Sequence, residues 1–200
     1  MMNKLFLTLI FFLGTVAVSA QDVQLPAPVR TGGLPLMDAL NKRQSVREYS
    51  AKAIESQKLS NLLWAAYGFN RDDKRTAPSA NNRQELEVYV ALPDGFYLYD
   101  AKANKLTLCA KGDYRKDTGG QDFVATAALN LVYVANLDKA NRETAGIDCG
   151  FISQNVYLFC ASEGLATVVR GSVNKDNLKK ILKLTDKQEI ILAQTVGYSK

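Results

Sequence analysis

The stretch RETAGIDCGFISQNVYLFCASEG, residues 142–164, decides how this chain folds. An apolar stripe at helical spacing runs along it, formed by Cys149, Ile152, Val156 and Phe159. Other directions on the same segment carry Phe151, Leu158 and Ala161. A helix that is apolar nearly all round is buried on more than one side. The stretch therefore predicts a central helix that packs on its own domain and also against a second subunit.

Working outward from this helix, the chain alternates between helical and strand-like patterns. Helices are predicted at residues 34–42, 55–67, 121–127 and 176–182, and strands at 86–92, 95–99, 105–110, 129–135, 167–169 and 189–196. The run LNLVYVA at 129–135 indicates a strand buried on both faces. Residues 70–83 are polar and predict a loop, and Gly68 stands where a helix C-cap glycine belongs. Strands that are partly joined as hairpins predict an α+β fold with a mixed or antiparallel sheet flanked by helices.

The first twenty residues have the order of a secretory signal. One positive charge at Lys4 precedes an apolar run, and Val18-Ser19-Ala20 supplies the small residues that signal peptidase recognises. An uncleaved membrane anchor is the alternative, but the run falls short of the roughly 20 residues that span a bilayer. We therefore expect a signal peptide at 1–20, an extended Pro- and Gly-rich arm at 21–33, and one domain at 34–200. The protein would be exported, to the periplasm or outside the cell, with no stable membrane anchor after cleavage.

The residue types that are missing limit the chemistry of the protein. The chain has no histidine, so Ser-His-Asp and Cys-His catalysis are excluded, as is a His-ligated zinc site. It has three cysteines but no CxxC, and it lacks GxGxxG and Walker sequences. We predict no metal site and no disulfide framework, with the cysteines acting as small apolar groups. An enzyme of this composition would depend on a bound cofactor for its chemistry.

The charge of the chain does not indicate a nucleic-acid partner. The net charge is +5, and the basic residues are scattered except for one short cluster, Lys175, Lys179, Lys180 and Lys183. Such a cluster is usually a solvated helix face, and this one lacks the interleaved aromatic residues of a nucleic-acid platform.

Four short stretches, in order, carry a resemblance to a known family. They are RQSVR at 43–47; LLWAAYG at 62–68 with RTAPSA at 75–80 and ELEVYV at 85–90; GFYLYD at 95–100; and DCG, QN and EGL at 148–150, 154–155 and 163–165. Together they resemble the nitroreductase family, and within it the SagB-type dehydrogenase branch, over residues 34–200. The resemblance implies FMN as cofactor and an intertwined homodimer with two FMN sites at the subunit interface.

The resemblance also implies which residues bind the cofactor. They are Arg43, Gln44, Ser45, Arg47, Pro78, Ser79, Ala80, Asn81, Glu163, Gly164 and Lys200. Arg43 and Ser45 would bind the phosphate, and Arg47 would place its charge on the N1 side of the flavin. Residues 78–81 would reach the flavin from the partner subunit, and the amide at Glu163-Gly164 would reach flavin N5.

Each of these stretches also has a plainer interpretation. RQSVR alone could be a solvated basic end of a helix. Residues 78–81 alone could form an ordinary turn, and Gly164 could be a helix C-cap. Lys200 is the last residue and is subject to fraying, while Ser199 stands where the family often has proline.

We expect an FMN-dependent oxidoreductase that passes hydride or electrons from reduced flavin to a small conjugated acceptor, such as a quinone or a nitro compound. The flavin N5 atom would carry the chemistry, and Arg47 and Gly164 would tune it. No catalytic residue is predicted beyond these two. The alternative is a non-catalytic flavin-binding or interaction protein that retains the fold. Azoline-forming relatives use a Lys-Tyr pair before the central helix, and residues 138–143 (DKANRE) lack one. An exported protein does not meet the cytoplasmic NAD(P)H pool, so the sequence leaves the electron donor open.

Overall fold

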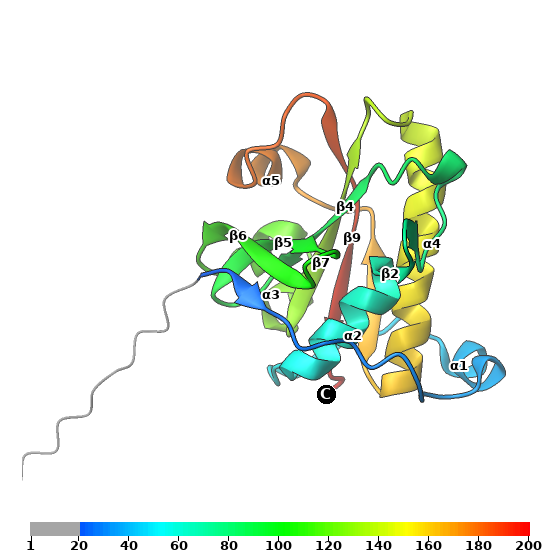
Figure 1. Ribbon diagram of the computed structural model, residues 1–200. Coiled ribbons are helices and arrows are strands. Elements are labelled where there is room, and N and C mark those ends of the chain that lie inside the picture. Colours follow the sequence, from blue (N-terminus) through cyan, green and yellow to red (C-terminus); the bar gives the residue numbers. More distant parts are fainter. Residues whose placement is uncertain (1–20) are drawn as a thin grey trace, which may run out of the picture.

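A seven-stranded sheet forms the centre of the fold (Figure 1). The computed structural model describes residues 21–200, so the predicted signal peptide lies outside the described residues. The strand order is β1-β6-β5-β4-β7-β9-β8, and each neighbouring pair is antiparallel. The strands are β1 (Val23–Gln24), β4 (Leu86–Ala91), β5 (Gly95–Asp100), β6 (Lys105–Lys111), β7 (Leu129–Asn136), β8 (Ala166–Arg170) and β9 (Gln188–Gly197). The α+β prediction is confirmed, and the sheet is antiparallel rather than mixed.

Strand β7 lies inside the sheet because both of its faces are apolar. It pairs with β4 from Leu86↔Ala135 to Ala91↔Asn130, and with β9 along its other edge. Alternate residues from Leu129 to Ala135 contribute to one hydrophobic core, whereas Val132 and Val134 contribute to a second core on the opposite face. This alternation follows from the two-residue period of a strand, and it confirms a strand buried on both faces.

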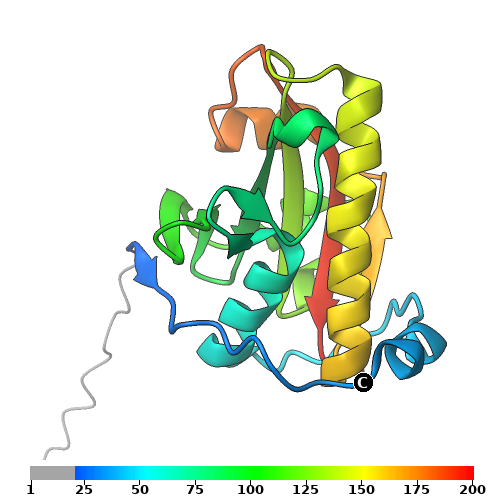
Figure 2. The same ribbon diagram turned by 45° about the vertical axis from the view of Figure 1, so that its right-hand side comes forward.

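Helices cover the two faces of the sheet unequally. They are α1 (Leu36–Lys42), α2 (Ser56–Tyr67), α3 (Phe123–Thr126), α4 (Arg142–Glu163) and α5 (Lys175–Ile181). The larger core lies where α2 and α4 pack on the sheet, and the smaller one lies under α5. Figure 2 shows α4 running along β9, with α1 projecting beside its C-terminal end. Among residues 21–200, no helix has the length and apolar character needed to cross a membrane.

The ends of α4 agree with the sequence. The Asn141 side chain accepts a hydrogen bond from the Thr144 N–H, which satisfies one of the free donors at the start of the helix. Gly164 ends it with φ +67°, a left-handed conformation in which glycine has no steric penalty. At about 1.5 Å per residue, this 22-residue helix is about 33 Å long.

One local prediction is wrong. Residues 70–83 are not a simple loop, because they contain the hairpin of β2 (Phe69–Arg71) and β3 (Lys74–Arg75) and the 3₁₀ turn Ala80–Asn82. The prediction of Gly68 as the C-cap of α2 is confirmed, and its backbone there is extended, with φ −74° and ψ 176°. Glycine is needed there because a Cβ would lie 2.3 Å from Cδ1 of Trp64.

The predicted arm at 21–33 is extended and well anchored. Its strand β1 adds to the sheet edge at β6, and Ser60 Oγ donates to the Pro26 carbonyl at 2.6 Å. Further along, Leu34 N–H donates to Ser162 Oγ at 2.8 Å, which ties the end of the arm to the last turns of α4.

Candidate functional site

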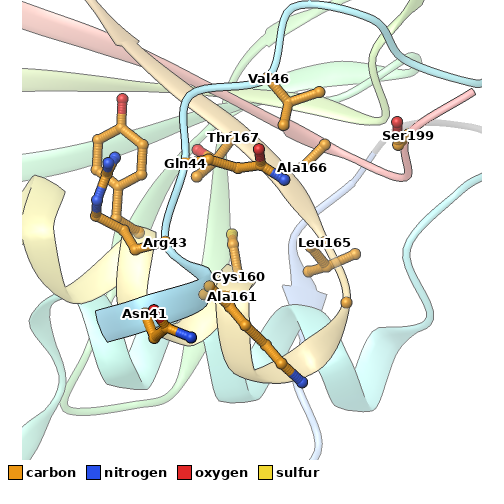
Figure 3. Close-up of a pocket in the computed structure, with 13 residues that line it drawn as sticks. Asn41, Arg43, Gln44, Val46, Cys160, Ala161, Leu165, Ala166, Thr167 and Ser199 are labelled. Carbon is orange, nitrogen blue, oxygen red and sulfur yellow. The ribbon is translucent and has the colours of Figure 1, made fainter. Parts of the chain in front are cut away.

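A pocket of about 490 Å³ opens beside the C-terminal end of α4. It is formed by the end of α1 with the segment after it, the last turns of α4, the start of β8, and the C-terminal tail (Figure 3). Its lining residues are Asn41, Lys42, Arg43, Gln44, Val46, Tyr157, Cys160, Ala161, Gly164, Leu165, Ala166, Thr167 and Ser199. The volume falls in the range of ordinary small-molecule sites.

The segment 43–47 is held against the sheet by its own backbone. Val46 N–H donates to the Thr167 carbonyl at 3.0 Å, and the Tyr49 hydroxyl donates to the Val46 carbonyl at 2.6 Å. These bonds fix the segment in an extended path, so Gln44 and Val46 face the pocket (Figure 3).

Tyr157 on α4 contacts two further residues of this segment, Arg43 and Ser45. The Arg43 guanidinium lies 5.2 Å from the centre of the Tyr157 ring, within range of a cation–π contact. The Ser45 and Tyr157 hydroxyls are 2.8 Å apart, and the Tyr157 oxygen also accepts from Val169 N–H at 3.0 Å. The sequence prediction missed Tyr157, although a tyrosine in an otherwise apolar helix signals a polar contact.

A second pocket lies on the other side of the same segment. Arg47 and Lys200 line it together, with Gly120, Gln121 and Phe123 opposite. The predicted basic residues are thus divided, because Arg43 lies in the first pocket whereas Arg47 and Lys200 lie in the second. The division follows the path of the chain, because residues up to Val46 line the first pocket and residues from Arg47 to Tyr49 line the second.

Glu163 and Gly164, where α4 ends, contribute no side chain to the first pocket, and only the Gly164 backbone lines it. Gly164 lines the pocket, but its N–H donates to the Cys160 carbonyl as the helix cap. A contact from this N–H to a cofactor would therefore share the donor between two acceptors. The Glu163 carboxylate turns away and pairs with Lys58 at 3.3 Å.

The predicted residues 78–81 lie far from the first pocket of the same chain. Ala80 N–H donates to Asp148 Oδ2 at 2.8 Å, which places this loop beside the first half of α4. Asp148 and Gly164 are sixteen positions apart on the helix, or about 24 Å along its axis. Within one chain the structure therefore does not bring these residues together with Arg43 and Gln44.

The electrostatics of the first pocket suit binding more than acid–base catalysis. Burial raises the pKa of the Cys160 thiol far above its usual value, so the thiol is neutral and unreactive. The lining adds a guanidinium, an amide and a lysine to an apolar wall that includes Val46, Leu165 and Ala166. Such a lining fits an anionic ligand that carries an apolar ring. The residues described contain no group of three or more His, Cys, Asp or Glu that could hold a metal ion.

Comparison with known proteins agrees with this site. The model of the nitroreductase family matches residues 40–198, which covers the segment after α1, the central helix and β9. The chain belongs to the nitroreductase family. A Methanocaldococcus jannaschii protein, provisionally named a nitroreductase, is 31% identical over 195 residues, covering 88% of this chain and 96% of its own.

Solved structures of the nitroreductase family share the fold. A Ralstonia eutropha JMP134 protein, also provisionally named a nitroreductase, superposes with a TM-score of 0.86 at 42% identity, covering 92% of both chains. An FMN-dependent nitroreductase of Clostridium difficile R20291 has a TM-score of 0.60 at 22% identity, covering 82% of this chain and 87% of that one. At that identity the second likeness speaks for the fold alone. The nitroreductase fold and an oxidoreductase family are thus established, and the SagB-type branch stays a prediction.

Proposed function

We propose that this chain is an FMN-dependent oxidoreductase that works as a homodimer and reduces a small conjugated acceptor, such as a quinone or a nitro compound. The observation that carries the proposal is the pocket at the end of α4, where basic and amide side chains meet an apolar wall. Family membership supports the reaction class.

The residues present fit FMN by the chemistry of their donors. A phosphate dianion needs charge-assisted donors, and Arg43, Lys42 and Gln44 offer them along one rim. An isoalloxazine ring needs an apolar surface with few polar groups, which Val46, Leu165 and the small residues of α4 and β8 provide. When bound, FMN would supply the redox chemistry through its N5 atom.

The chain's own groups would then bind and orient. Arg43 is held in place by the Tyr157 ring, so little side-chain entropy is lost when it binds an anion. Ser45 is fixed by the Tyr157 hydroxyl and could turn its proton toward a phosphate oxygen, because the phenol can donate in return. Arg47 and Lys200 keep positive charge on the neighbouring pocket and attract anions to this end of the protein.

A second subunit is part of the proposal because one chain leaves the site incomplete. Residues 78–81 can join the pocket only from a partner, given the separation of about 24 Å along α4. Exposed apolar side chains are available to such a partner on two helices: Leu36, Met37 and Leu40 on α1, and Ile147 and Phe151 in the first half of α4. Large exposed apolar groups gathered on neighbouring helices mark an interaction surface.

An FMN titration tests the proposal. The protein from Gln21 to Lys200 should bind about one FMN per chain, with quenched flavin fluorescence. Arg43→Ala removes a charge-assisted contact worth about 1.5–3 kcal/mol, so affinity should fall roughly tenfold to more than a hundredfold. Arg71→Ala removes an exposed arginine that lines neither pocket near α4 and should bind FMN normally.

Absence of binding by the unsubstituted protein would refute the cofactor assignment. Equal losses in Arg43→Ala and Arg71→Ala would refute the pocket, because only general electrostatic attraction would then remain.

A further inference from the structure

Two carboxylates are buried together where the loop after the hairpin meets α4. Glu85 precedes β4 and is 1% exposed, and Asp148 on α4 is 3% exposed. Neither carboxylate oxygen of Glu85 receives a hydrogen bond from the residues described. Burial raises the pKa of Glu85, and Asp148, which is within hydrogen-bonding reach, raises it further. Two ionised carboxylates in this position would repel each other in a medium of low dielectric, and the Glu85 oxygens lack a partner among the described residues that would offset their lost hydration.

One proton resolves this conflict. If Glu85 is the acid, its O–H can donate to Asp148, and Asp148 alone carries the charge. Asp148 has a further donor that suits an anion, because its Oδ2 accepts from Ala80 N–H at 2.8 Å. The arrangement gives every charged atom a partner and leaves one buried charge in place of two.

The loop that Asp148 holds is conformationally strained. Asn81, Asn82 and Gln84 have φ of +52°, +55° and +48°, a left-handed region that residues other than glycine rarely adopt. Three left-handed residues within four positions are unfavourable for the backbone itself, so bonds to other groups must hold them. These bonds include Ala80 N–H to Asp148, Arg75 Nε to Gln84 Oε1 at 2.9 Å, and Gln84 Nε2 to the Asp73 carbonyl at 2.7 Å.

We propose that Glu85 and Asp148 share a single proton, and that this acid pair positions the strained loop of residues 79–84. The inference deepens the proposed function, on which its catalytic meaning rests, because the loop includes the residues that would enter the partner subunit's site. Glu85 and Asp148 are then positioning residues that touch neither cofactor nor acceptor.

Two of the groups around the pair, Tyr67 and Cys149, are neutral, and one cation, Arg83, lowers the pKa of Glu85. Tyr67 of α2 has a buried hydroxyl without a partner among the described residues, and its pKa is raised to about 12, chiefly by burial. Cys149 on α4 is neutral, since burial raises its pKa to about 12. Arg75 stacks 4.1 Å from the centre of the Tyr67 ring. Arg83 opposes the shift of Glu85, but burial outweighs it.

The sign of the pH dependence follows from the raised pKa of Glu85. The closed loop holds the proton more tightly than an open loop, in which Glu85 returns toward its ordinary pKa of 4.5. The closed form is therefore fully favoured below pH 4.5. The closed form loses stability as the pH rises toward the raised pKa of Glu85. The equilibrium constant for opening the loop then increases by up to tenfold per pH unit.

Hydrogen exchange at Ala80 N–H measures this opening without any cofactor. In the unsubstituted protein, the protection factor of this N–H, corrected for intrinsic exchange, should fall by up to tenfold per pH unit above about pH 4.5. It should level off once the pair has ionised. Glu85→Gln keeps a donor to Asp148 that cannot ionise, so its protection should not change with pH. Glu87→Gln, two residues further on in β4, is the matched control, and it should retain the pH dependence of the unsubstituted protein.

A second variant protects the test if Glu85→Gln does not fold. Asp148→Asn keeps an acceptor for Ala80 N–H and adds a donor that stabilises the ionised Glu85, so its protection should fall less steeply with pH than in the unsubstituted protein. Three results would overturn the proposal: constant protection in the unsubstituted protein between pH 4.5 and 7.5, an unchanged fall in both variants, or protection that depends on added calcium at fixed pH.

A titration with FMN separates this inference from the proposed function. If both hold, FMN affinity should weaken with rising pH in the unsubstituted protein more than in Glu85→Gln. If FMN does not bind at all, the proposed function fails while the exchange result still decides the acid pair.

Discussion

Replacing Ile147 and Phe151 with alanine should dissociate the proposed dimer. The two side chains are one helical turn apart on α4 and point the same way, with exposed fractions of 58% and 43%. Complete burial of such a side chain is worth about 1.5–3 kcal/mol, so covering the exposed half contributes about 1 kcal/mol.

In a two-fold dimer each side chain is buried twice, so the pair contributes about 4 kcal/mol. Since 1.4 kcal/mol corresponds to a tenfold change, the double substitution should weaken dimerisation roughly a thousandfold. Sedimentation equilibrium of both proteins measures this directly. The isolated chain should stay folded, because the side chains are exposed and alanine favours helix.

Val29→Ala serves as the matched control, since Val29 is 54% exposed but lies on the N-terminal arm. Its association should equal that of the unsubstituted protein. A monomeric unsubstituted protein at concentrations of tens of micromolar would refute the reasoning. So would a double variant that associates normally, since the partner would then use another face.

Three further predictions concern stability, thiol chemistry and turnover. Gly68→Ala places a Cβ against Trp64 and should lower the free energy of unfolding by about 1–3 kcal/mol in a urea titration. Asn141→Ala removes the N-cap of α4 and should lower the free energy of unfolding by about 1 kcal/mol in the same titration. A thiol reagent at pH 8 should modify at most one cysteine in the native protein and all three after unfolding, because Cys149 and Cys160 are buried and neutral; modification of a second native thiol would contradict this. Protein reduced with dithionite should be reoxidised by menadione faster than free FMN, and equal rates would favour a non-catalytic flavin-binding protein.

The amino-acid pattern was sufficient to predict most elements of the fold. The helix at 142–164 was predicted because its apolar stripe and its C-cap glycine are local signals. The doubly buried strand β7 and the hairpin strands β4 and β5 were predicted for the same reason. The hairpin of β2 and β3 was missed, because strands of three and two residues are too short to show a periodicity that would indicate a strand.

The candidate site was predictable only in part. RQSVR was recognised from sequence, and the structure places Arg43 and Gln44 at the pocket beside Gly164. The separation of Arg47 and Lys200 into a neighbouring pocket was not predictable, because it depends on how Val46 hydrogen-bonds to β8. Tyr157 was missed for a similar reason, since its partners Ser45 and Val169 come from distant parts of the chain.

The sequence by itself determined the elements, the family and the reliance on a cofactor, because periodicity, capping residues and the lack of histidine are properties of the chain alone. Only the tertiary structure decided that the strands form a purely antiparallel sheet, that residues 78–81 lie about 24 Å along α4 from the pocket, and that Glu85 meets Asp148 in the interior. Contacts between residues far apart in sequence depend on the packing of whole elements, and burial then sets the charge of a group that looks ordinary in the sequence.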